Sequence, residues 1–445
     1  MNDMRRTILW VVFSVSLVLL WDAWNKHNGQ PSMFSPAPAR TVAAAGSAPG
    51  AAPAVAGGTA GAMPGLPAAA APVASEKVTI ETDVLRATLD SKGGDLVRLE
   101  LLKHADLVDA KKAVVLFDHS ATRVYLAQTG LYNANGAGAL PNHLTVMRVV
   151  PGERKLAEGA KSVSISFESP EVGGVKLVKT LTFNRGEYTV GISHTLKNVS
   201  GAAISPKLYL QLARDGRIEG NTNMLAGPTA YTGPAMYTDA GKFFKVEFAD
   251  IDKSLKGSTI DHVKSADNGW VAMVQHYFAS TWIVNAKEAR EFSFSRIDAD
   301  AANFNQPLYR TAMVLPLGEL APGAERKHEA VLFAGPQEGK KLEGLAPGLE
   351  LVKDYGWFTI LAKPLYWLLD QLHTLLGNWG WAIVLLVVML KIAFYWLNAS
   401  AYKSMAKMKA INPKVMAMRE RYKDKPQEMQ QEMMRIYREE KVNPL

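Results

Sequence analysis

Cysteine is absent from the 445-residue chain, and this absence limits its chemistry first. Without thiols the chain has no disulfide, no thiolate metal site and no cysteine nucleophile. The H-E-x-x-H, G-x-S-x-G and G-x-x-x-x-G-K-[ST] signatures of zinc proteases, serine hydrolases and phosphate-binding loops are also missing. We therefore expect no enzyme activity, no cofactor and no metal.

Acidic residues are outnumbered, 42 against 50 Lys and Arg, which gives a formal net charge of +8. Such a balance favours anionic lipid or nucleic acid as a partner. The last 45 residues carry eleven Lys and Arg against six Asp and Glu, directly after an apolar run. Basic segments beside a membrane span stay on the cytoplasmic side, so we expect anionic lipids as partners and no specific nucleic acid.

Long apolar runs are few, and the clearest extends from Trp379 to Leu397. Its nineteen residues match the length of a transmembrane helix, so residues 378–398 are predicted as a membrane span. One charge, Lys391, lies inside this run, where it costs roughly 2.5 to 3.5 kcal/mol. A charge kept in such a place indicates a functional site. The alternative is an amine that extends to the cytoplasmic interface without a further role.

The first apolar run follows Arg5 and Arg6. Residues 1–26 are accordingly predicted as an uncleaved signal-anchor transmembrane helix with a cytoplasmic N-terminus. Residues 27–75 consist largely of Ala, Pro and Gly. Such a composition cannot bury enough surface to offset its conformational entropy, so a flexible tether is expected.

Residues 76–345 show short strand patterns separated by turn residues, for example at Ser91–Gly94. One strand alternates apolar and polar residues, with inward positions at Tyr188, Val190, Ile192 and His194. His194 is predicted to be a core or rim histidine. A region of this length can form one large all-β sandwich. Because the predicted spans cross the membrane in opposite directions, we expect this domain in the periplasm.

Residues 355–377 change to helical periodicity, with polar residues on the opposite side. The predicted amphipathic helix would lie on the outer membrane interface, with Pro364 in its first turn and a break at Gly377–Gly380. The alternative is a helix packed against the sandwich. The apolar residues assigned to the interface are Trp357, Leu361, Leu365, Leu368 and Leu372.

Residues 399–445 indicate two amphipathic helices joined by a tight turn, a cytoplasmic α-helical hairpin. Asn412 and Pro413 are predicted as the N-cap and first residue of a helix. Seven of the 17 methionines lie in this region. Methionine suits the binding of varied apolar partners, and the alternative is that these residues only hold the hairpin together. The predicted contact residues are Met405, Met408, Met418, Met429 and Met433.

Four long stretches are distinctive: NGWVAMVQHYFASTWI, DYGWFTILAKPLYWLLDQLHTLLGNWGW, SMAKMKAINPK and MRERYKDKPQEMQQEMMRIYREEKVNPL. They resemble the YidC family of membrane protein insertases of Gram-negative bacteria, and the resemblance extends over all of the chain except the tether. It implies a multi-domain membrane protein with transmembrane helices, a periplasmic β-supersandwich like that of mutarotases and a cytoplasmic helical hairpin. It also implies a hydrophilic groove that opens to the cytoplasm and to lipid.

The chain departs from the family at two positions of the second span. Lys391 matches the groove arginine and keeps its charge, but lysine lacks the planar fork that binds a carboxylate with two hydrogen bonds. Trp396 stands where the resemblance would place a proline, so the usual cause of a kink is missing. Because the family continues past VNPL with four further spans, we expect an N-terminal fragment, inactive alone, with two of six spans.

The resemblance implies an insertase and chaperone of the bacterial inner membrane that works with or without the Sec translocon. Its partners would be nascent membrane proteins, the Sec translocon, the ribosome with the signal-recognition targeting machinery, and anionic lipids. One alternative is a membrane-tethered periplasmic domain that binds or modifies carbohydrate. Another is a scaffold for translocon or cell-envelope partners.

Overall fold

A computed structural model describes residues 75–106, 109–134, 136, 138–217, 231–297, 306–353, 355, 358–422 and 426–439. The chain divides into two compact units, Met1–Asp354 and Tyr355–Leu445. The predicted signal-anchor helix, nearly all of the tether and Trp357 lie outside the described residues.

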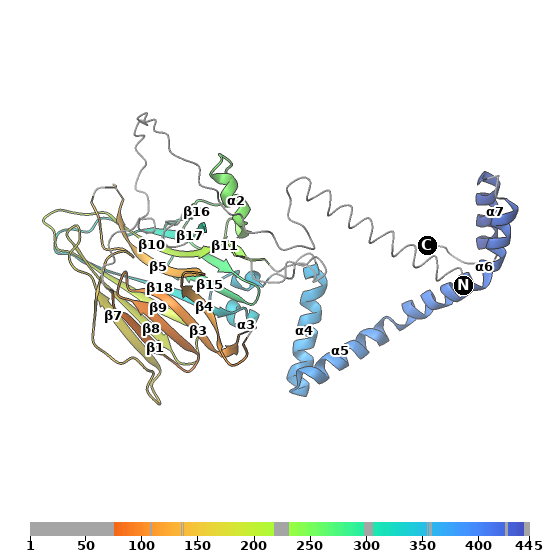
Figure 1. Cartoon of the computed structure of the whole chain (residues 1–445), viewed down its shortest axis with the longest axis horizontal. Coiled ribbons are helices and arrows are strands. Elements are labelled where there is room, and N and C mark those ends of the chain that lie inside the picture. Colours follow the sequence, from red (N-terminus) through yellow and green to blue (C-terminus); the bar gives the residue numbers. More distant parts are fainter. Residues whose placement is uncertain are drawn as a thin grey trace, which may run out of the picture. The chain divides into compact units, whose positions relative to one another are not determined.

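The first unit contains two nine-stranded sheets (Figure 1). The first sheet has the strand order β1 (Lys77–Glu81), β2 (Leu85–Asp90), β3 (Asp95–Ala105), β4 (Ala113–His119), β5 (Val124–Asn133), β10 (Pro206–Asp215), β17 (Leu308–Pro316), β16 (Arg290–Ile297) and β13 (Ser265–Ala266). The second has the order β12 (Lys242–Lys245), β11 (Gly233–Thr238), β14 (Trp270–Val274), β15 (Phe278–Ile283), β18 (Glu325–Pro336), β9 (Thr189–Asn198), β8 (Val175–Asn184), β7 (Ser162–Glu168) and β6 (Arg148–Val149).

The alternation of apolar residues along these strands produces one shared core. On β8, for example, Leu177 and Leu181 are buried while Lys176 is exposed. Side chains from both sheets belong to a single hydrophobic cluster, so the two sheets pack face to face as a sandwich. The prediction of a large all-β domain is confirmed.

Two details of the predicted strands are also confirmed. Gly93 and Gly94 have φ values of +75° and +61°, and they form the turn between β2 and β3. Tyr188, Val190 and Ile192 are buried, as their alternation predicts. Short helical segments complete the unit: α2 (Phe248–Ser254), α3 (Gly339–Glu343) and the 3₁₀ helix η2 (Leu349–Val352).

The described part of the second unit consists of helices and short connections. Its elements are α4 (Thr359–Leu376), α5 (Trp379–Ala393), α6 (Tyr395–Arg421) and α7 (Pro426–Glu439). Among the described residues, no helix combines the length and the apolar composition that a bilayer crossing requires. The membrane span at residues 378–398 therefore stays a prediction.

Three helix details differ from the prediction. Pro364 is the sixth residue of α4 and not part of its first turn. Pro413 lies inside α6, so Asn412 is no N-cap there. The apolar run does not form one helix, because α5 ends before Phe394 and α6 starts after it, although no proline is present. Low helix propensity of Phe394, Tyr395 and Trp396 gives a physical reason for this interruption.

Candidate functional site

The turn between α4 and α5 is built from residues with distinct local roles. Gly377 adopts φ +63°, the left-handed conformation that ends many helices, and its N–H donates to the His373 carbonyl at 2.8 Å. Asn378 is the N-cap of α5, where its Oδ1 accepts the Trp381 N–H at 3.2 Å. The predicted break at Gly377–Gly380 is confirmed. Gly377 and Asn378 are the two residues that connect α4 to α5.

Side chains on either side of this turn hold the two helices together. The rings of His373 and Trp379 stack with centroids 3.8 Å apart and an angle of 7° between their planes. Within α4 and α5, which are both wholly described, Leu372 and Ala382 are the buried residues. The contact between α4 and α5 is therefore concentrated at one end of each helix. We call residues 372–382 the α4–α5 corner.

Lys391 lies in the last turn of α5 and is exposed. Cations are stabilised at a helix C-terminus by the helix dipole, so its position also fits α5 on purely local grounds. Val387 and Val388, one turn earlier, are exposed apolar residues. An amine beside exposed apolar side chains can attract a carboxylate. The attraction is stronger in an apolar environment than in water, because the dielectric constant is lower.

The residues assigned to an interfacial face of α4 have graded exposure. Leu361 and Leu365 are exposed, Leu368 is half-buried and Leu372 is buried. Leu372 therefore packs inside the protein, at the α4–α5 corner, and is not available to lipid. The other three leucines keep the assignment as a prediction.

The methionines of α6 and α7 divide into two groups. Met418 is buried, with 6% of its surface exposed, together with Ile411 and Val415 on the same face of α6. Met408, Met429 and Met433 are half-buried. Met405 is 59% exposed, and so are two residues outside the predicted set, Met416 at 62% and Met434 at 54%. Met418 thus packs inside the helical unit, whereas Met405, Met416 and Met434 are accessible, and their contact with a partner stays a prediction.

A row of polar residues inside the sandwich was not predicted. Lys179, His194 and His328 are neighbours across β8, β9 and β18. The Lys179 amine donates to Asp95 at 3.1 Å and to the Gly93 carbonyl at 2.5 Å. The alternation of β8 signals it in the sequence, because Lys179 occupies an inward position between Leu177 and Leu181.

The histidines of this row connect the interior to the surface. His194 is fully buried, as predicted for a core histidine, and its Nε2 lies 2.8 Å from the Thr129 hydroxyl. His328 Nε2 lies 2.6 Å from the partly exposed carboxylate of Glu288. Burial, aided by the positive charge of Lys179, lowers the pKa of His194 well below its usual range. Burial also raises the pKa of Asp95 to about 6, although Lys179 partly opposes this.

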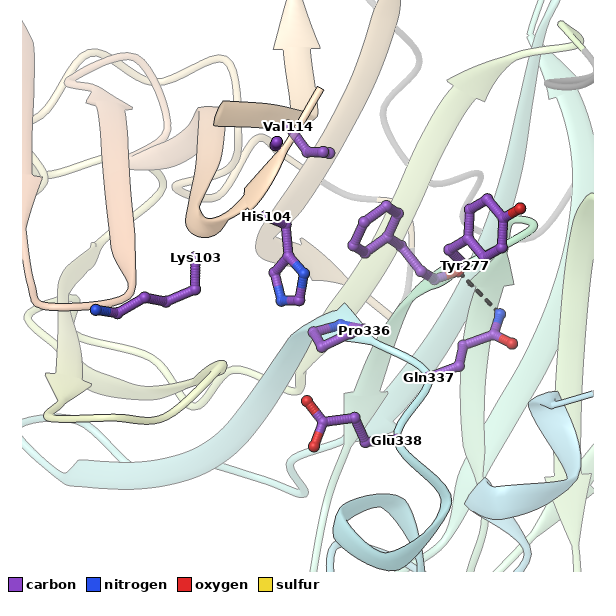
Figure 2. A pocket seen from close by; sticks show the side chains of 9 residues that line it. Lys103, His104, Val114, Tyr277, Pro336, Gln337 and Glu338 are labelled. Carbon is purple, nitrogen blue, oxygen red and sulfur yellow. Dashed lines mark hydrogen bonds between the residues drawn. The ribbon is translucent and has the colours of Figure 1, made fainter. Parts of the chain in front are cut away.

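A pocket of about 430 Å³ opens at the rim of the sandwich. Figure 2 shows His104, Pro336 and Glu338 among its lining side chains, together with Gln337, which donates to the Phe278 carbonyl at 3.1 Å. The imidazole of His104 lies 3.1 Å from the Tyr188 hydroxyl. The lining contains aromatic rings and charged groups of both signs. This mixture does not favour any single class of ligand. Among the described residues, no three His, Asp or Glu side chains gather as a metal site.

Comparisons with known proteins cover both units. Residues 77–368 match the family model described as the YidC periplasmic domain, and residues 371–445 match the one described as 60Kd inner membrane protein. A Janthinobacterium protein and a Cupriavidus necator protein, both named membrane protein insertase YidC, are 46% and 49% identical. Each alignment covers 100% of this chain and 77% of the relative. A galactose mutarotase-like protein from Lactobacillus casei, 10% identical, matches 58% of this chain and all of its own with a TM-score of 0.36. A likeness at that level says nothing about activity.

Proposed function

The chain belongs to the YidC family of membrane protein insertases, and from this premise we propose that it inserts proteins through a hydrophilic groove in which Lys391 provides the positive charge. The observation that carries the proposal is identity of 46–49% to insertases along the whole chain. Membrane protein insertion is its function, and a membrane is its location. The groove and the role of Lys391 are the finer parts of the proposal.

Lys391 would act by attracting acidic residues in the polar tail of an incoming protein. An attraction between opposite charges is worth more at low dielectric, so one exposed amine among apolar side chains can hold such a tail part-way across. The substrate's own apolar helix then supplies the driving force for release into lipid, at about 0.8 kcal/mol per buried CH₂. No nucleotide is needed for this step.

The other helices have supporting roles in the proposal. The exposed apolar side chains of α4, among them Leu361 and Trp367, suit the outer membrane interface. The exposed methionines of α6 and α7 suit transient contact with varied apolar segments of nascent membrane proteins. Contacts with the Sec translocon, the ribosome, the signal-recognition machinery and anionic lipid belong to the same proposal.

We place the sandwich in the periplasm and the α6–α7 pair in the cytoplasm of a bacterial inner-membrane protein. The support is the match of residues 77–368 to the family's periplasmic domain and the basic charge after α5. We assign no enzymatic reaction. The carbohydrate-directed alternative is not favoured, because the identity to insertases extends along the whole chain.

Charge variants at Lys391 test the proposal in the full-length protein. Cells depleted of their own insertase would receive Lys391→Arg or Lys391→Glu, and insertion of a substrate with an acidic periplasmic tail would be followed by protease accessibility. We expect Lys391→Arg to insert normally and Lys391→Glu to insert poorly, because glutamate repels the tail. A substrate with a neutral tail is the matched control. Normal insertion of the acidic tail by Lys391→Glu would exclude the attraction.

A further inference from the structure

We propose that the ring stack of His373 on Trp379 is a positioning device for insertion, which fixes the direction of α5 and thereby the place of Lys391. The proposal rests on the role of Lys391 proposed above. In this proposal His373 and Trp379 act through the direction of α5 and not through contact with Lys391, which follows Trp379 by twelve residues.

The helices α4 and α5 are held together near the turn that connects them. Their connection consists of Gly377 and Asn378, and their buried residues, Leu372 and Ala382, lie within five positions of it. Beyond Ala382, no residue of α5 up to Lys391 is buried. Figure 1 shows the two helices meeting at this one end. The angle between them is therefore set at the α4–α5 corner.

The length of α5 makes the position of Lys391 sensitive to the angle at the α4–α5 corner. Lys391 follows Trp379 by twelve residues, which corresponds to about 18 Å along a helix. A swing of about 10° at the corner would displace the start of the Lys391 side chain by about 3 Å at that rise per residue. Such a displacement is as long as a hydrogen bond. A flexible corner would therefore spread the Lys391 amine over a range of positions.

The rings of His373 and Trp379 form a flat stack between the two helices. A centroid separation of 3.8 Å and an interplanar angle of 7° mean that the rings cover each other almost face to face. The two residues belong to different helices, His373 to the last turn of α4 and Trp379 to the start of α5. Opening of the corner would separate the two rings and lose this stacking contact. Trp381, two residues later, is not stacked on any described ring, and 68% of its surface is exposed. It therefore serves as the comparison for Trp379.

Spin-label distances in the full-length protein test the positioning directly. The absence of native cysteine allows a single pair, Lys363→Cys on α4 and Met389→Cys on α5, to be labelled cleanly. We expect a narrow distance distribution in this background. His373→Ala and Trp379→Leu should broaden it clearly, since the loss of one ring pair shifts populations by about 2- to 10-fold. His373→Phe, which retains a flat ring, should restore the narrow distribution, and Trp381→Leu should leave it unchanged.

Insertion by the same variants without labels completes the experiment. We expect His373→Ala and Trp379→Leu to slow insertion at normal protein accumulation, and His373→Phe and Trp381→Leu to insert normally. An unchanged distance distribution in His373→Ala would overturn the proposal, and so would a broadened distribution with normal insertion. Equal losses in Trp379→Leu and Trp381→Leu would indicate that both tryptophans only anchor the chain at an interface. Failure of the Lys391 role itself would appear separately, as normal insertion of acidic tails by Lys391→Glu.

Discussion

Lys179 donates a hydrogen bond to Asp95 at 3.1 Å in the interior of the sandwich, where the exposed fractions of the two side chains are 2% and 5%. The same amine donates to the backbone carbonyls of Gly93 and Thr129. Gly93 lies in the turn between β2 and β3, and Thr129 lies on β5. One lysine of the second sheet therefore binds three groups of the first sheet. These hydrogen bonds fix the position of one sheet relative to the other.

Removal of the amine should destabilise the sandwich strongly. Lys179→Met leaves Asp95 buried without its partner, and loss of one member of a buried ion pair typically costs about 3–5 kcal/mol. We expect a loss of this size in the free energy of unfolding at pH 7, measured by urea denaturation of a fragment of residues 75–353. Lys176→Met, on the exposed face of the same strand, is the control and should change it by less than about 0.5 kcal/mol.

The loss in the free energy of unfolding of Lys179→Met should be smaller at pH 5 than at pH 7. The pKa of Asp95 is already raised to about 6 by burial, and removal of the neighbouring positive charge raises it further. The carboxyl can therefore take up a proton and bury a neutral group. An equal loss at pH 7 and pH 5 would contradict the assignment of the cost to an unpaired carboxylate.

His194 should make the sandwich sensitive to acid. Its pKa is lowered well below 6.5 in the folded state, so below pH 6.5 the unfolded chain binds a proton that the folded chain excludes. Stability from this group is present above pH 6.5 and falls on acidification by up to about 1.4 kcal/mol per pH unit. Asp95 acts in the opposite sense, because its raised pKa makes the folded state bind the extra proton below pH 6.

The variant His194→Gln separates these two effects. It removes the acid-sensitive group and keeps Asp95, so its stability relative to the unmodified chain should improve as pH falls from 7 to 5, by about 1–2 kcal/mol. Urea denaturation at each pH measures the difference. A constant difference between His194→Gln and the unmodified chain across this range would show that burial does not hold this histidine neutral.

Local patterns in the sequence were sufficient to predict a large all-β domain, the turn at Ser91–Gly94 and a core or rim position for His194. Period-two alternation reports which face a residue occupies, and glycine reports where the backbone needs positive φ. The same alternation places Lys179 inward, but its partner Asp95 is 84 positions away in the chain. Pairing at that separation depends on how two sheets pack, and no local pattern contains that information.

The helices show the same limit. Asn412–Pro413 has the residues of a helix start, yet α6 continues through it. The buried face of α6 crosses the proline, with Ile411 before it and Val415 and Met418 after it. Packing of this face outweighs the local preference, as tertiary contacts often do. At the α4–α5 corner the break was predictable from glycine, whereas the stack of His373 on Trp379 depends on the angle between two helices.

Replacement of Pro413 should stabilise α6. A proline inside a helix removes one hydrogen bond and clashes with the carbonyl four residues earlier, here that of Lys409, at a cost of about 3 kcal/mol. Pro413→Ala should therefore slow amide hydrogen exchange in the turns around residue 413. Pro426→Ala, at the first position of α7 where proline is tolerated, should have little effect. Equal responses of the two variants would mean that α6 does not continue through residue 413.

Met416 and Met418 distinguish the two roles that methionine could have in the α6–α7 pair. Met418→Ala removes a buried contact and should loosen the pair, because truncation of a buried methionine costs about 2–5 kcal/mol. Met416→Ala removes a side chain that is 62% exposed and should leave the pair intact. Limited proteolysis between α6 and α7 measures the first effect, and insertion in the full-length protein measures the second. If exposed methionines receive the substrate, Met416→Ala slows insertion without faster proteolysis. Normal insertion by the double variant Met416→Ala, Met434→Ala would exclude a role of these exposed methionines in receiving the substrate. Methionine would then serve only to hold the helices together.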